Sequence, residues 1–177
     1  MFFNSVSTEK KLHKEISVIR SKSSLIFLVG MMGSGKSTIG NIIARILQYR
    51  FVEMDALLEE KLKMSINDIF TKYGEEFFRT EEGKLLDEIC LMEKCVVSCG
   101  GGTFANSQNI KKINASGISV FLNVSSGVIE ARLAGDEKRP LLKNGISISN
   151  ILLKRIPFYT QAHVMVDILY SNIEKNI

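Results

Sequence analysis

The chain has 177 residues, 45% of them hydrophobic and 24% charged, with a formal net charge of +4, a balance that suits one globular domain with a full core. Residues 1–23 carry five basic side chains against two acidic ones, so the remaining body is nearly neutral and no nucleic-acid-binding surface is expected. No apolar run reaches the roughly 18 residues that a membrane-spanning helix requires, and the N-terminus lacks the apolar stretch of a secretory signal. We therefore expect neither a nucleic acid nor a membrane as a partner.

The cysteine pattern indicates a reducing compartment. Cys90, Cys95 and Cys99 form no C-x-x-C pair, and an odd number of cysteines fits no disulfide framework. Because thiols are kept reduced in the cytosol, we expect a cytoplasmic protein, and we expect it to be monomeric.

Residues 1–23 form an N-terminal extension in the predicted organisation. Leu12, Ile16 and Ile19 recur at helical spacing, which predicts a short amphipathic helix. This segment is either a helix packed against the rest of the chain or a frayed tail. Residues 24–177 form the one predicted domain.

Within that domain, apolar strands alternate with helical segments. Strands are predicted at 25–29, 51–54, 95–98, 118–124 and 164–169. Helices are predicted at 37–48, 56–73 (one or two helices), 75–92, 106–115, 125–133 and 149–162, with Pro157 bending or shortening the last one. Residues 134–146 are polar and charged and are predicted to form a mobile loop. The alternation predicts an α/β fold, in which a five-stranded parallel sheet carries helices on both faces.

A glycine-rich loop follows the first predicted strand and opens the first predicted helix. Its sequence, GMMGSGKS at 30–37, matches G-x-x-x-x-G-K-[ST]. Its backbone N–H groups are expected to face phosphate groups at the positive end of the helix. Lys36 adds a charge for the transferring phosphoryl group, and Ser37 offers a hydroxyl to Mg²⁺. The residues expected to bind ATP here are Gly33, Ser34, Gly35, Lys36, Ser37 and Thr38.

A phosphate loop predicts a nucleotide but not a reaction, because GTPases, ATPase motors and small kinases share it. The chain is short, has no N-K-x-D guanine signature and has no apolar strand ending in an Asp-Glu pair. We therefore predict a small-molecule kinase that uses ATP and Mg²⁺.

Further motifs follow the phosphate loop in a fixed order. They are Glu53-Met54-Asp55, SINDIF at 65–70, GEEFFR at 74–79 with Glu82, VSCGGG at 97–102, KRPLL at 138–142, and RIPFY at 155–159 with Ala162. With them, residues 25–167 resemble the shikimate kinase family. The resemblance implies the three-layer fold of P-loop NTPases, the strand order 2-3-1-4-5 and a mobile lid loop. It also implies phosphorylation of the 3-hydroxyl of shikimate by ATP, giving shikimate 3-phosphate for chorismate and aromatic amino-acid biosynthesis.

The resemblance implies an acceptor site. Arg79 and Arg155 resemble the family arginines that bind the shikimate carboxylate, a group that planar guanidinium groups suit. Asp55 resembles the aspartate that holds the acceptor hydroxyls, either orienting one or accepting its proton. The three glycines after the third strand resemble a turn that the substrate approaches closely, and the middle one is the strongest candidate. The implied substrate-binding residues are Asp55, Arg79, Gly100, Gly101, Gly102 and Arg155.

The resemblance also implies residues on the nucleotide side. Arg139, in the predicted loop, resembles a lid arginine that closes over the phosphates and stabilises the transferring charge. Arg132 resembles a residue near the adenine. Mg²⁺ is expected to bind Ser37 directly, and Glu53 and Ser98 through water. The implied catalytic residues are Lys36, Asp55 and Arg139.

Three features depart from the family pattern. Glu53 stands where the family has aspartate, which keeps the charge and moves it by one methylene, so we expect a modest cost in Mg²⁺ binding. The lid between Arg132 and Arg139 is short. The chain also stops ten residues after Asp167, so the family's adenine-contacting loop and closing helix are expected to be short or absent. We hypothesise that the helix within residues 1–23 covers the surface that they leave.

Two other functions stay open at this stage. One is a kinase of the same fold that phosphorylates another acceptor, such as gluconate or a nucleoside. The other is a kinase-like protein that binds ATP or a partner without catalysis, for which Glu53 and the short C-terminus are the only support. Arg79 and Arg155 favour a carboxylate as the acceptor, and Asp55 favours a polyol.

Overall fold

Strands and helices alternate along the chain in the computed structural model, which describes residues 24–133 and 147–168. The elements are β1 (Leu25–Val29), α2 (Lys36–Leu47), β2 (Arg50–Glu53), α3 (Met54–Leu62), α4 (Ile66–Ile89), β3 (Cys95–Ser98), the 3₁₀ turn η1 (Thr103–Ala105), α5 (Ser107–Ser116), β4 (Ile118–Asn123), α6 (Ser126–Leu133), α8 (Ile148–Tyr159) and β5 (Val164–Asp167). The helix predicted within residues 1–23 and the loop predicted at 134–146 lie outside the described residues.

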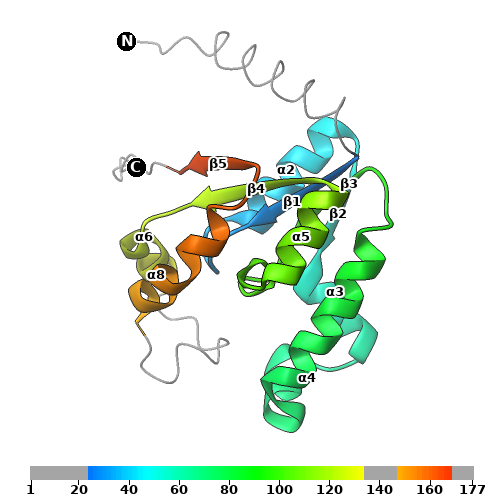
Figure 1. The fold of residues 1–177 in the computed structure, drawn as a ribbon, viewed down its shortest axis with the longest axis vertical. Coiled ribbons are helices and arrows are strands. Elements are labelled where there is room, and N and C mark those ends of the chain that lie inside the picture. The colour runs from blue at the N-terminus through cyan, green and yellow to red at the C-terminus, as the bar shows by residue number, and fades with distance from the viewer. Residues whose placement is uncertain (1–23, 134–146, 169–177) are drawn as a thin grey trace, which may run out of the picture.

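The five strands form one sheet in the order β2-β3-β1-β4-β5, and every neighbouring pair is parallel (Figure 1). This confirms the predicted fold class and strand order. Ser98 of β3 lies in register with Leu28 of β1 on one side and with Glu53 of β2 on the other. The carboxyl ends of three strands therefore lie level, and α/β folds bind ligands at this edge of the sheet.

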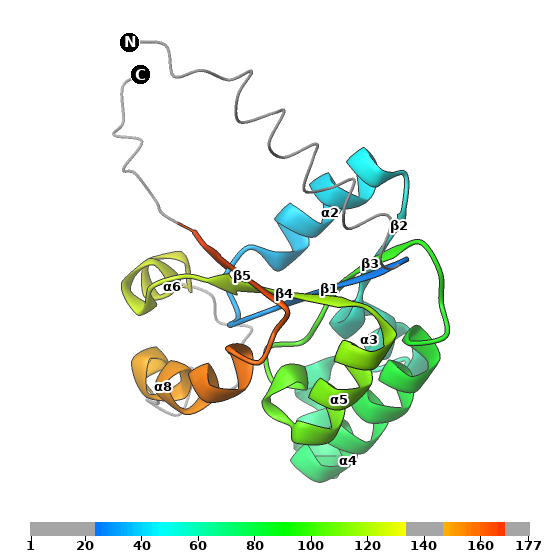
Figure 2. The same cartoon turned by 45° about the horizontal axis from the view of Figure 1, so that its top comes forward.

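Helices cover both faces of the sheet, but unequally. Helix α2 lies on one face, and α3, α4, α5 and α8 lie on the other (Figure 2). Alternate residues of β1 follow this division: Phe27 and Val29 belong to the larger core under the four helices, whereas Ile26 and Leu28 belong to a smaller core under α2. All five residues of β1 are buried, as expected for a central strand of a parallel sheet.

The face that carries α2 exposes several apolar side chains in the described structure. Ile42 and Ile46 of α2 are 52% and 45% exposed, and Val164 and Val166 of β5 are 41% and 38% exposed. The helix predicted within residues 1–23, which we hypothesise to cover the surface left by the short C-terminus, lies outside the described residues. In the two described stretches, no helix is long and apolar enough to cross a membrane.

Helix boundaries differ from the prediction near residues with a positive φ or near proline. α3 stops at Leu62 because Lys63 adopts a left-handed conformation, with φ of 51°. α4 continues through the predicted break between 73 and 75, but Gly74 within it has φ of 81° and ψ of 175°, so two helical stretches meet at a kink. α8 ends at Tyr159, two residues after Pro157, which confirms the predicted shortening.

Candidate active site

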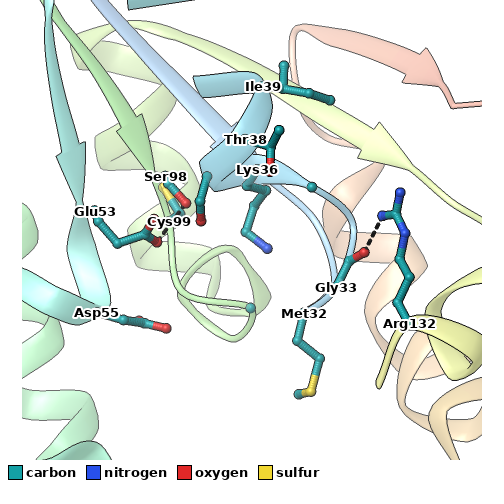
Figure 3. Close-up of a pocket in the computed structure, with 13 residues that line it drawn as sticks. Met32, Gly33, Lys36, Thr38, Ile39, Glu53, Asp55, Ser98, Cys99 and Arg132 are labelled. Carbon is teal, nitrogen blue, oxygen red and sulfur yellow. Dashed lines mark hydrogen bonds between the residues drawn. The ribbon is translucent and has the colours of Figure 1, made fainter. Parts of the chain in front are cut away.

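The phosphate loop is a tight backbone turn between β1 and α2. Gly30 has φ of 140°, and a Cβ atom there would lie 2.9 Å from the Leu122 carbonyl oxygen, so only glycine fits. Lys36 Nζ donates to the carbonyl oxygens of Gly30 at 3.0 Å and Met31 at 2.8 Å. The ammonium group is thereby held inside the curve of the loop, where the motif predicts a phosphate (Figure 3).

The predicted loop residues are not equally available to a ligand. Gly33, Gly35, Ser37 and Thr38 line a pocket with a volume of about 490 Å³, a size typical of small-ligand sites. Ser34 is 1% exposed and does not line this pocket, and its backbone N–H donates to the Met31 carbonyl at 3.2 Å. Of the predicted loop residues, Ser34 is therefore the least accessible to a phosphate.

The pocket is electrostatically suited to an anion. It opens at the N-terminus of α2, whose first turn contains no acidic residue, so the positive end of the helix is not neutralised. Lys36 also lines the pocket, and Arg132 lines it from the end of α6. Arg132 Nη1 donates to the Gly33 carbonyl at 2.5 Å, which ties the arginine to the phosphate loop.

Two acidic residues and a serine face the loop across the pocket. Glu53, at the end of β2, accepts a hydrogen bond from Ser98 Oγ at 2.8 Å, and Asp55 follows in the first turn of α3. Figure 3 shows Asp55 and Lys36 pointing into the same space from different elements. Mg²⁺ bound with substrate phosphates needs only one or two protein oxygen ligands and keeps several waters. Ser37 as a direct ligand, with Glu53 and Ser98 reaching the ion through water, fits that requirement.

The glycine-rich turn after β3 is enclosed by three functional side chains. A Cβ on Gly100 would lie 2.7 Å from Asp55 Oδ1, and one on Gly102 would lie 2.6 Å from both terminal nitrogens of Arg79. A Cβ on Gly101 would lie 3.4 Å from a terminal nitrogen of Arg155. The prediction explained these glycines by close approach of a substrate. The structure adds a second reason, because charged side chains already occupy the space that larger residues would need.

Arg79 is held by acidic residues on its own helix. It pairs with Glu75 at 3.1 Å and with Glu82 at 2.9 Å. Glu82 is 2% exposed and also accepts a hydrogen bond from Thr103 Oγ1 at 2.6 Å. Burial lowers the pKa of Arg79, but Glu82 and Glu75 outweigh it, so the pKa lies above its usual value. The guanidinium is therefore charged and fixed in direction.

Arg155 is placed by helix α8 and by the phosphate loop. Its Nη1 contacts Met31 Sδ at 3.7 Å, and its charge lies close enough to Tyr159, four residues later on the same helix, to oppose the rise in the pKa of that hydroxyl. Tyr159 in turn donates to the Gly101 carbonyl at 2.5 Å. Arg155 thus lies between the nucleotide pocket and the glycine turn.

Sequence reasoning did not assign roles to Glu82, Thr103 or Tyr159. Glu82 follows Arg79 by three residues and Tyr159 follows Arg155 by four, which are the spacings of neighbours on one helix face. These spacings were a usable signal. Thr103 gave none, because its contact with Glu82 joins residues 21 positions apart. Arg139, the predicted lid arginine, lies outside the described residues.

Comparison with known proteins identifies the family of this chain. The family model described as shikimate kinase matches residues 32–175. The chain belongs to the shikimate kinase family. A shikimate kinase of Sulfurihydrogenibium sp. (strain YO3AOP1) is 43% identical over 80% of this chain and 86% of that protein.

Solved structures of shikimate kinases also share the fold. A shikimate kinase from Acinetobacter baumannii in complex with shikimate matches with a TM-score of 0.80 and 32% identity, covering 85% of this chain and 86% of that one. A crystal structure of shikimate kinase from Bacteroides thetaiotaomicron matches with a TM-score of 0.76 and 37% identity, covering 81% of this chain and 85% of that one. The predicted family is confirmed.

Proposed function

We propose that the protein transfers the γ-phosphate of ATP to the 3-hydroxyl of shikimate, giving ADP and shikimate 3-phosphate. The observation that carries the proposal is the convergence of Asp55, Arg79 and Arg155 on the glycine turn beside the phosphate loop. Membership of the shikimate kinase family supports it. The product would enter chorismate and aromatic amino-acid biosynthesis, and we further propose that the enzyme is a cytoplasmic monomer.

The acceptor part suits a carboxylate that carries hydroxyl groups. Two guanidinium groups, from Arg79 and Arg155, lie against Gly102 and Gly101, and guanidinium pairs recognise a carboxylate through planar hydrogen bonds. Asp55 lies on the other side of the turn, against Gly100, where its carboxylate would accept hydrogen bonds from hydroxyl groups. An acceptor with a carboxylate at one end and hydroxyls at the other matches both the guanidinium pair and the Asp55 carboxylate.

Transfer needs the hydroxyl and the phosphate to be aligned. We assign Asp55 to orient the attacking hydroxyl and to accept its proton, and Lys36 to stabilise charge on the transferring group. Arg139 would add positive charge over the phosphates, and Arg132 would contact the nucleotide. When bound, Mg²⁺ neutralises phosphate charge, and Ser37 would hold it directly while Glu53 and Ser98 would hold its water shell.

A coupled assay of ADP release tests the proposal. We expect ATP turnover that depends on shikimate, with mass spectrometry and NMR placing the phosphate on the 3-hydroxyl. Gluconate and a nucleoside serve as alternative acceptors in parallel reactions. Faster turnover with gluconate or the nucleoside than with shikimate would identify that compound as the acceptor instead. Binding of ATP without turnover for any acceptor would point to a kinase-like binding protein instead.

A further inference from the structure

Tyr159 is a buried side chain at the junction of helix α8 and the glycine turn. It is the last residue of α8 and is 0% exposed, and its ring stacks on Phe121 with centroids 5.0 Å apart. A phenylalanine would satisfy this packing equally well. The hydroxyl therefore needs a separate explanation, because a buried polar atom is costly unless it is hydrogen-bonded.

The hydroxyl of Tyr159 contacts the centre of the glycine turn in the acceptor site. It donates to the Gly101 carbonyl oxygen at 2.5 Å, and Gly101 is the residue against which the Arg155 guanidinium lies. Gly101 itself lies between Arg155 and the phosphate loop, since a Cβ there would be 3.4 Å from both Arg155 Nη1 and the Met32 backbone nitrogen. One hydroxyl thus contacts the residue that lies between the carboxylate-binding arginine and the phosphate loop.

The peptide that Tyr159 contacts is intrinsically soft. The Gly101 carbonyl and the Gly102 N–H belong to one planar unit and point in opposite directions, so a bond to one end fixes the other. A peptide between two glycines can rotate at low cost, because neither residue has a Cβ to restrict it. The hydrogen bond from Tyr159 selects one orientation of this peptide. Arg79 packs directly against Gly102, the residue that supplies the N–H end of the same peptide.

The hydroxyl keeps its proton under all ordinary conditions. Burial raises the pKa of Tyr159 to about 12, although Arg155 and Arg79 act in the opposite direction. The donor to Gly101 is therefore present across the pH range of a kinase assay. This matches a fixed geometrical role rather than a proton-transfer role.

We propose that Tyr159 is a positioning residue for the acceptor: its hydroxyl fixes the Gly101–Gly102 peptide, against which the Arg155 guanidinium lies, in the arrangement that binds shikimate. This inference rests on the proposed function. It predicts that loss of the hydroxyl weakens the acceptor site selectively, because none of its contacts reaches Lys36, Ser37 or the α2 N-terminus.

Steady-state kinetics of Tyr159→Phe test the proposal. We expect the KM for shikimate to rise about tenfold and the KM for ATP to change less than twofold. The fold decrease in kcat should be smaller than the fold increase in the KM for shikimate. Tyr49→Phe is the matched control, because it removes a hydroxyl from a half-buried tyrosine that packs on the small core under α2. Both KM values should stay unchanged in that variant.

A binding measurement without catalysis gives a second readout. Shikimate alone should raise the melting temperature of the wild-type chain, since a ligand that binds only the folded state stabilises it. At the same shikimate concentration, the increase should be smaller in Tyr159→Phe and unchanged in Tyr49→Phe.

The outcomes separate the inference from the proposed function. Unchanged shikimate KM in Tyr159→Phe would overturn the inference, even if the melting temperature of the free protein falls. An equal rise in both KM values would overturn it too, because that result indicates general disruption. Absence of shikimate-dependent turnover in the wild-type chain would instead contradict the proposed function.

Discussion

The acceptor part and the nucleotide part of the site are held by different means. In the acceptor part, side chains from separate elements fix one another, as in the chain of hydrogen bonds from Arg79 through Glu82, both on α4, to Thr103 of η1. In the nucleotide part, one continuous loop provides the geometry, and Lys36 bonds to the loop's own carbonyls. The geometry of the nucleotide part therefore depends mainly on the eight consecutive residues 30–37, whereas the acceptor part depends on how α3, α4 and α8 pack.

This difference predicts that substitutions will divide into two kinetic classes. Changes in the loop should reduce transfer without affecting shikimate binding. Changes among the packed side chains should reduce shikimate binding without affecting ATP binding.

Lys36→Ala should have the largest effect. We expect a loss of several kcal/mol of transition-state stabilisation in kcat/KM, where about 1.4 kcal/mol is a tenfold change in rate. Shikimate should still raise the melting temperature of the variant, because Lys36 Nζ bonds to carbonyl oxygens of the phosphate loop. Lys61→Ala, on the surface of α3, is the control. Loss of the shikimate-induced shift in Lys36→Ala would contradict the division.

Asp55→Asn should also cost several kcal/mol of transition-state stabilisation, through kcat. Asparagine keeps the size of the side chain beside Gly100 but loses the charge and the proton acceptor. The KM for ATP should stay within about twofold, measured by ADP release at saturating shikimate. Asp87→Asn, whose carboxylate pairs with Lys112 on the surface, should leave kcat unchanged.

Arg155→Ala and Arg79→Ala should each weaken the acceptor site. Loss of one partner of a buried carboxylate pair costs about 2–5 kcal/mol, which corresponds to roughly 30-fold to several thousand-fold in kcat/KM for shikimate. Arg45→Ala, near the end of α2, is the surface control. Near-normal kcat/KM for shikimate in either active-site variant would remove the carboxylate assignment.

Tyr159 should also make stability depend on pH. Its pKa is raised from 10.0 to about 12 by burial, so its neutral form is favoured in the folded chain and an unfolded tyrosine ionises first as the pH rises. The contribution of neutral Tyr159 to the free energy of unfolding is complete below pH 10. It is lost between about pH 10 and 12, which lowers the free energy of unfolding by up to roughly 3 kcal/mol. Urea unfolding from pH 8 to 11 should show a steeper decline for the wild type than for Tyr159→Phe. Parallel curves would contradict the raised pKa.

Glu53→Asp should have the smallest effect on activity. Restoring the family's aspartate shortens the side chain by one methylene and changes its reach to Ser98 Oγ, which now donates to it at 2.8 Å. We expect the Mg²⁺ concentration at half-maximal rate to fall a few-fold, with the KM for shikimate unchanged. A titration of Mg²⁺ at fixed ATP measures this, and a change in shikimate KM would show that Glu53 serves both parts of the site.

The same division explains what the sequence could predict. β1 and β3 have the predicted bounds, because short apolar runs buried on both faces leave little ambiguity. The phosphate loop was predictable because its residues are consecutive. The end of α3 was not, since a lysine rather than a glycine adopts the left-handed conformation there. The resemblance to a family supplied the acceptor residues, but not the contacts of Thr103 with Glu82 and of Tyr159 with Gly101, which join residues far apart in the sequence and depend on tertiary packing.

Cys99 lies at the junction of the two parts, and its burial has a practical consequence. It borders the pocket, yet it is 1% exposed, and burial raises the pKa of its thiol well above the usual value, although Lys36 opposes this. Only the thiolate reacts readily with peroxide or with electrophiles. Oxidants should therefore react slowly with Cys99, and cysteine-directed covalent inhibitors are not expected to modify it.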